Sequence, residues 1–114
     1  MQVLFESRDV RADHLRELAE QRAMFALRRL CWLVPRARIQ LSDLNGPRGG
    51  LDKRCRVELK TQGSGSVVIT SIARDWRKAI DEALARAAHA LVRVWRRSQA
   101  RGRGTPRAIG FDYS

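Results

Sequence analysis

The chain has 114 residues, which fits one domain with a modest core and excludes two domains of ordinary size. Its 23 lysines and arginines outnumber its 12 aspartates and glutamates, so the formal net charge is +11. That charge is far from the value expected of an ordinary soluble enzyme. It favours a polyanionic partner, with nucleic acid a better candidate than an anionic membrane.

Residues 2–7 begin the chain with a short, β-prone segment. Val3 and Phe5 alternate with Leu4 and Glu6, and this period of two predicts an opening strand. No basic segment with a cleavage site, as in an export signal, is found there. No apolar run in the chain approaches the length needed to cross a bilayer, so we expect a cytoplasmic protein with no membrane partner.

A helical pattern begins at Asp13, the expected N-cap, and ends at Pro35. The apolar residues expected to share its packing side are Leu15, Leu18, Ala19, Phe25, Ala26, Leu30 and Leu33. Arginines at positions 16, 22, 28 and 29 keep much of the remaining surface basic.

Residues 36–44, 52–61 and 67–72 are predicted to form three further strands, separated by glycine-rich turns at 45–50 and 62–65. In the first two of these strands, apolar and polar side chains alternate, so the polar ones should share one face. The basic residues expected on that outward face are Arg36, Arg38, Arg54, Arg56 and Lys60.

Residues 74–97 show the strongest helical pattern of the chain, with Asp75 as its expected N-cap. One face is apolar and is expected to pack: Trp76, Ile80, Ala83, Leu84, Ala87, Leu91, Val94 and Trp95. A second face, roughly 150° around the helix, is basic. We call it the basic stripe, and it comprises Lys78, Arg86, His89, Arg93, Arg96 and Arg97.

The predicted order β-α-β-β-β-α indicates an α+β fold: a four-stranded, mainly antiparallel sheet with two helices packed on one face. We expect residues 1–98 to form the folded domain. The tail, residues 99–114, lacks apolar periodicity and is predicted to be flexible and basic.

The residues offer little to catalysis, and we expect no enzyme, no cofactor, no metal site and no small-molecule substrate. His14 and His89 have no partners at metal-ligand spacing, and the glycines at 46, 49 and 50 do not match a phosphate loop. Cys31 and Cys55 lie in apolar patterns that suit buried free thiols in a reducing cytoplasm.

RNA binding is better supported, because the basic stripe and the outward strand residues would form two basic surfaces. Trp76 and Trp95 belong to the packing face, so exposed aromatic side chains are expected to be scarce. That favours recognition of the nucleic-acid backbone and shape over base stacking.

The first twenty residues, MQVLFESRDVRADHLRELAE, resemble the start of short ribosome hibernation-promoting factors. The segment 73–97 is similar to the last helix of that family, with Asp75, Ala79, Ile80 and Asp81 matching its Asp-x-x-x-Ala-Ile-Asp start. The chain departs from the pattern at Arg77, where the family usually has an aromatic residue. Its last turn is rich in arginine where the family has lysine.

The resemblance covers residues 1 to about 98. It implies a protein that binds the small ribosomal subunit between head and body through ribosomal RNA. There it would block the tRNA and mRNA sites and inhibit translation under stress or in stationary phase. By the same resemblance, Lys78, Arg86, His89 and Arg93 are expected to face ribosomal RNA.

Two alternatives remain open. A double-stranded-RNA-binding module shares the α-β-β-β-α core, and Gly46-Pro47 and Arg77-Lys78-Ala79 are similar to parts of its pattern. However, the histidine expected after Gly-Pro is absent, and the opening strand fits the hibernation family better. The other alternative is a small scaffold or partner-binding protein whose charge only aids solubility.

Overall fold

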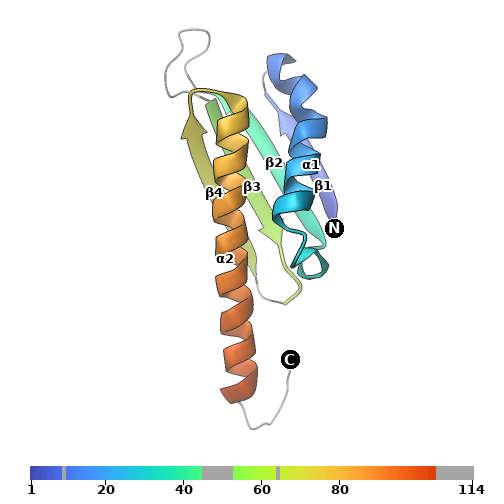
Figure 1. Ribbon diagram of the computed structural model, residues 1–114, viewed down its shortest axis with the longest axis vertical. Coiled ribbons are helices and arrows are strands. Elements are labelled where there is room, and N and C mark those ends of the chain that lie inside the picture. The colour runs from blue at the N-terminus through green and yellow to red at the C-terminus, as the bar shows by residue number, and fades with distance from the viewer. Residues whose placement is uncertain (9, 45–52, 64, 105–114) are drawn as a thin grey trace.

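The computed structural model describes residues 1–8, 10–44, 53–63 and 65–104. Its strands and α-helices follow the predicted order β-α-β-β-β-α (Figure 1). They are β1 (Gln2–Ser7), α1 (Arg16–Ala26), β2 (Arg36–Asp43), β3 (Lys53–Lys60), β4 (Ser66–Ala73) and α2 (Trp76–Gly104). Two 3-10 helices, Val10–Leu15 and Cys31–Leu33, flank α1. The predicted turn at 45–50 lies outside the described residues.

The four strands form one sheet in the order β1-β2-β3-β4. β1 pairs with β2 in parallel, and the other two pairings are antiparallel. A parallel pair cannot be joined by a hairpin, so the connection through α1 is what the β1–β2 pairing requires. The prediction of a mainly antiparallel sheet is confirmed.

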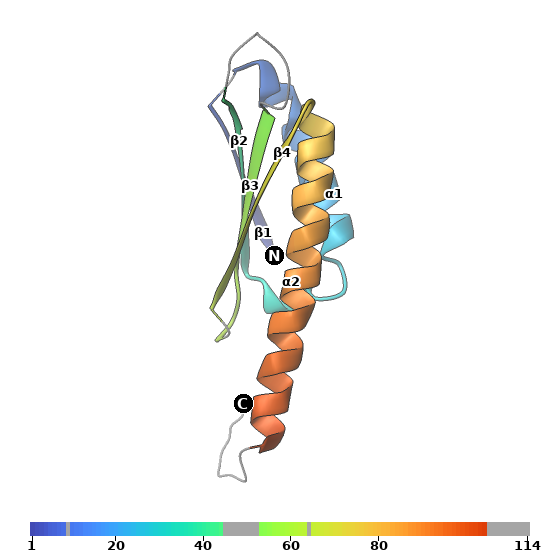
Figure 2. The same cartoon turned by 90° about the vertical axis from the view of Figure 1, so that its left-hand side faces the viewer.

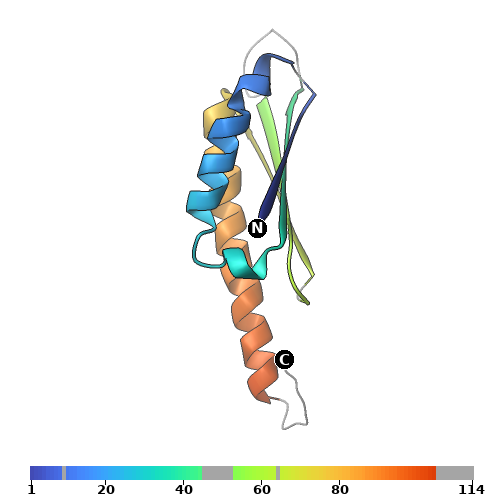
Figure 3. The same cartoon turned by 90° about the vertical axis from the view of Figure 1, so that its right-hand side faces the viewer.

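Both helices cover the same face of the sheet and leave the other face open (Figures 2 and 3). α1 lies beside β1 and β2, whereas α2 lies over β3 and β4 (Figure 1). The strands alternate as predicted: Ala37, Ile39, Leu41, Cys55, Val57 and Leu59 are all buried beneath the helices. Their neighbours in β2 and β3 therefore point to the open face, because successive side chains of a strand alternate in direction.

Helix α1 differs from the prediction at both ends. Asp13 lies inside a 3-10 helix, and the residue that precedes α1 is Leu15, which makes no side-chain capping bond. α1 also ends at Ala26, well before Pro35. The reason is tertiary: Pro35 O accepts a bond from Gln2 N at 2.9 Å, so the chain must leave the helix layer early to reach the sheet.

Helix α2 begins as predicted, because Asp75 Oδ1 accepts a hydrogen bond of 2.8 Å from Lys78 N. Its apolar face packs on the sheet, with Ile80, Leu84 and Leu91 almost completely buried. The helix does not end near Ser98 but continues to Gly104, beyond the end of the sheet (Figure 2). A helix can extend without an apolar face because each added residue contributes a backbone bond. Residues 105–114 of the predicted tail lie outside the described part of the chain.

Candidate nucleic-acid interface

All members of the α2 basic stripe are exposed: Lys78, Arg86, His89, Arg93, Arg96 and Arg97. They share a side of α2 because the helix turns about 100° per residue, while the apolar residues of the same turns point at the sheet. The sequence therefore located this surface correctly. Its contact with RNA stays a prediction.

Part of the α2 basic stripe lines a hollow of about 520 Å³ between α2 and the edge strand β4. We call it the β4 hollow. Its lining residues are Ile69, Arg86, His89, Val92, Arg93 and Arg96. A lining that combines arginine side chains with the apolar Ile69 and Val92 suits a ligand that has both charged and apolar parts. Lys78 and Arg97, by contrast, do not line it.

Arg86 is the residue that connects this surface to the sheet. Its Nη1 donates a hydrogen bond of 3.2 Å to the backbone oxygen of Thr70 in β4. β4 is an edge strand, so its outer backbone groups have no neighbouring strand to pair with. The guanidinium has five N–H donors, and one such bond leaves others available for phosphate oxygens.

A carboxylate interrupts the positive charge nearer the start of α2. Glu82 accepts a hydrogen bond of 3.0 Å from Ser71 Oγ, and Ser71 is buried on the helix-covered face of β4. The bond satisfies the serine hydroxyl and joins α2 to β4. The positive charge of the stripe is therefore concentrated from Arg86 onward, towards the end of the helix.

A second basic surface lies on the open face of the sheet, where the sequence predicted it. Arg36 and Lys60 are directly opposite each other on β2 and β3, and both are exposed. The other cations lie farther along the two strands and are partly buried: Arg38, Arg54 and Arg56. We call these residues the open-face cations.

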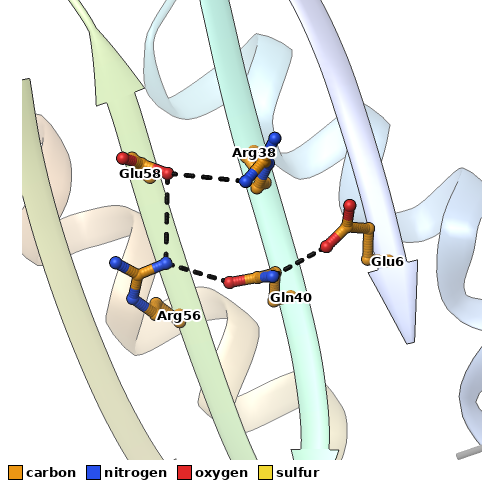
Figure 4. A network of polar contacts seen from close by, with 5 residues as sticks. All are labelled: Glu6, Arg38, Gln40, Arg56 and Glu58. Atoms are coloured by element: carbon orange, nitrogen blue, oxygen red, sulfur yellow. Dashed lines mark hydrogen bonds and ion pairs between the residues drawn. The ribbon is translucent and has the colours of Figure 1, made fainter. Parts of the chain in front are cut away.

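Polar contacts hold several open-face cations in place (Figure 4). Gln40 Nε2 donates to Glu6 Oε1 at 2.7 Å, and Arg56 Nη1 donates to Gln40 Oε1 at 3.0 Å. Glu58 Oε1 lies 3.9 Å from both Arg38 Nη1 and Arg56 Nη1. One carboxylate is thus shared by two arginines, and the pairs are partly exposed, which limits each to about 0–1 kcal/mol of stability. The network orders the arginines without cancelling their charge.

At one end of the network, a small hollow of about 150 Å³ is lined by Arg36, Arg38, Glu58 and Lys60. Three cations face one carboxylate there, so the hollow attracts anions. Arg38 Nε is buried and has no hydrogen-bond partner among the described residues. At the other end, Arg54 Nε donates to Ser42 Oγ at 3.1 Å, which directs that guanidinium along the sheet.

The two basic surfaces adjoin at β4. Thr70 pairs with Arg56 of β3, and the backbone oxygen of Thr70 accepts the bond from Arg86. A polyanion that followed the edge of the sheet could therefore contact both surfaces. Only the width of one strand separates them.

The expectation that exposed aromatic residues are scarce is wrong. Phe25 is 67% exposed and Trp32 is 58% exposed. Phe25 lies roughly 120–160° around α1 from the buried Ala19 and Ala23, so it does not share their packing side. That angle was available in the sequence, and it could have removed Phe25 from the predicted core.

Of the two free thiols that were expected to be buried, Cys55 is buried and Cys31 is partly exposed. Burial raises the pKa of the Cys55 thiol to about 12, so this group stays protonated at neutral pH and is a poor nucleophile. Within residues 1–8, 10–44, 53–63 and 65–104, no group of three His, Cys, Asp or Glu side chains could hold a metal ion. Across the same ranges, no helix is long and apolar enough to cross a membrane.

No protein-family model matches the sequence, and no curated protein matches it significantly. Solved structures do match. The chain is similar to the N-terminal domain of Protein Y from Thermus thermophilus, with 22% sequence identity and a TM-score of 0.63. That match covers 82% of this chain and 98% of the other.

The chain is also similar to a ribosomal subunit interface protein from Coxiella burnetii, with 19% sequence identity and a TM-score of 0.67. Here the match covers 84% of this chain and 99% of the other. At these identities the comparisons establish the fold, and they confirm at that level the resemblance drawn from the sequence. The chain therefore has the fold of Protein Y's N-terminal domain and of a ribosomal subunit interface protein.

Proposed function

We propose that this protein is a ribosome hibernation factor that acts in the cytoplasm. It binds the small ribosomal subunit through ribosomal RNA, blocks the tRNA and mRNA sites, and inhibits translation under stress or in stationary phase. The observation that carries this proposal is the pair of adjoining basic surfaces, the α2 basic stripe and the open-face cations, on this particular fold.

The chemistry of the two surfaces supports an RNA partner. Arginine guanidinium groups donate two parallel bonds to one phosphate, and both surfaces are rich in arginine. The ordered arginines beside Gln40 and Glu58 need little side-chain rearrangement to bind. In the proposed role the protein acts by occupying a site, and no reacting group is required.

The additional strand favours this function over the double-stranded-RNA-binding alternative. β1 pairs with β2 along its whole length, from Gln2 opposite Arg36 to Ser7 opposite Leu41. The α-β-β-β-α core of the alternative module has no such strand. The two similar solved structures, one of them named a ribosomal subunit interface protein, support the same choice.

The decisive experiment is co-sedimentation at cellular salt with purified small subunits, large subunits and a free RNA duplex. We expect stoichiometric binding to small subunits in preference to duplex, together with dose-dependent inhibition of translation in vitro. Preferential binding to the duplex would support the alternative module. Inhibition at far less than one protein per ribosome would indicate catalysis and contradict the proposal.

A charge-reversal variant tests which surface binds. Arg86→Glu should strongly weaken co-sedimentation, because the residue lines the β4 hollow. Arg77→Glu is the matched control: it is exposed on the same helix but lies about 180° around it from Arg86. Equal losses from the two variants would show that only net charge matters.

A further inference from the structure

The outer surface of the two helices carries a second hollow, distinct from the β4 hollow. It has a volume of about 360 Å³, within the range of about 300–1,000 Å³ typical of small-ligand pockets. We call it the interhelix hollow. Its lining comprises Arg22, Phe25, Ala26 and Arg28 of α1 and its C-terminal turn, and Asp81, Leu84, Ala85, Ala88 and His89 of α2.

Phe25 contributes an aromatic ring to the lining of the interhelix hollow. The ring is 67% exposed, so it is accessible to a ligand in the hollow. Arg28 is held against it: the guanidinium carbon lies 4.4 Å from the centre of the ring, and Nη1 donates a 3.1 Å bond to Phe25 O. The ring and the guanidinium thus form an ordered pair of planar groups.

The charge around Phe25 suits an anionic ligand. Asp81, the carboxylate of the hollow, lies 3.8 Å from Arg22 and is compensated by it. The guanidinium of Arg28 then leaves the hollow with positive potential and apolar walls. An apolar peptide side chain would use the walls alone, whereas a nucleotide uses both features.

His89 lines the interhelix hollow and also the β4 hollow. The two hollows therefore adjoin across the exposed ridge of α2. An RNA strand whose phosphates bind Arg86, Arg93 or Arg96 in the β4 hollow can place a base over this ridge, next to Phe25.

We propose that the interhelix hollow binds one unpaired nucleobase of an RNA strand, stacked against the Phe25–Arg28 pair. This inference rests on the proposed function for its ligand, RNA, and adds a contact to the base itself. Stacking on aromatic rings tolerates any base, since every base presents a π face. The protein would therefore prefer RNA with splayed, unpaired nucleotides over a continuous duplex.

The test compares the wild type, Phe25→Ala, Phe25→Trp and Met24→Ala. Met24 is the matched control, because it is an exposed apolar neighbour that does not line the hollow. The probes are a short single-stranded RNA and the same RNA with abasic sites. We expect Phe25→Ala to weaken binding of the intact RNA about 5- to 150-fold, the usual loss for one stacked base. Binding of the abasic RNA should be unchanged.

Two further readouts separate stacking from charge and from structural damage. Phe25→Ala removes no cation, so the slope of affinity against salt should equal that of the wild type. Phe25→Trp should retain affinity, and its fluorescence should be quenched by the intact RNA more than that of the wild type.

Equal wild-type affinity for intact and abasic RNA would overturn the inference, as would an equal loss for Met24→Ala. A loss of small-subunit binding by Phe25→Ala, with unchanged binding of the single-stranded RNA, would show that the hollow takes a protein side chain and also overturn it. These results are independent of wild-type co-sedimentation with small subunits, which tests the proposed function by itself.

Discussion

Arg86 Nη1 lies 3.2 Å from the backbone oxygen of Thr70, so a cation of α2 binds the exposed edge of β4. The contact satisfies an edge carbonyl that would otherwise depend on water. It also holds one guanidinium at the junction of the α2 basic stripe and the open-face cations. Arg86 thus has a small structural role beside its expected role in binding.

Replacing Arg86 with alanine should change the free energy of unfolding by less than about 1 kcal/mol, because the lost bond is exposed to solvent. The same change should weaken small-subunit binding. Urea denaturation and co-sedimentation measure the two effects. A loss of several kcal/mol would instead mean that this bond fastens α2 to the sheet.

Binding should weaken steeply as salt rises, because each cation that neutralises a phosphate releases counterions. Arg93→Ala and Arg96→Ala should each reduce the slope of log affinity against log salt by about one unit or less. Arg77→Ala, on the opposite side of α2, should leave the slope unchanged. If all three variants behave like the wild type, the α2 basic stripe is only a solvated surface.

Truncation of the apolar face of α2 should destabilise the fold. Ile80 is fully buried and Leu91 is 1% exposed, so Ile80→Ala or Leu91→Ala should cost about 2–5 kcal/mol in the free energy of unfolding. Lys78→Ala serves as the control, since that side chain is exposed. A larger loss of stability for Lys78→Ala than for the two apolar changes would contradict the burial of this helix face.

The raised pKa of Cys55 predicts a loss of stability at alkaline pH. The folded state holds the thiol proton more tightly than the unfolded state, because burial raises the pKa from 9.0 to about 12. This contribution is fully present below pH 9.0 and falls as the pH rises towards about 12. The stability difference between the wild type and Cys55→Ala should therefore shrink over that window in urea denaturation.

A chemical control accompanies this prediction. In the native protein, an alkylating reagent should modify the partly exposed Cys31 and spare Cys55. Rapid modification of Cys55 under native conditions would show that its site opens readily. It would also contradict the burial of Cys55 in the core.

The strands could be predicted from the sequence because their pattern is local. Cys55, Val57 and Leu59 alternate with charged residues, and only one assignment buries the apolar set. The two ends of α1 could not be predicted in this way. The C-terminal end depends on the path to the sheet, where Gln2 and Pro35 form a bond between residues distant in sequence. At the N-terminal end, the residues before Arg16 form a 3-10 helix.

In the candidate site, too, some features follow from local sequence patterns and others do not. Helical periodicity alone predicts that the α2 basic stripe is exposed, and all of its residues are exposed in the structure. The bond from Arg86 to Thr70 and the sharing of Glu58 by two arginines depend on how strands and helix are placed in space. Phe25 was missed because an aromatic residue in an apolar pattern is usually buried.

The end of α2 provides the last prediction, since the helix continues to Gly104 past the end of the sheet (Figure 2). Deleting residues 99–114 should leave the melting temperature nearly unchanged, because that segment lacks the apolar periodicity needed to join the core. It should weaken small-subunit binding partly, since Arg101, Arg103 and Arg107 are lost. Replacing those three arginines with glutamine in the full-length chain separates charge from length, and it should reproduce the loss of affinity. A melting curve and a co-sedimentation titration measure both effects. A large fall in melting temperature would make the segment structural, and unchanged binding would exclude it from the interface.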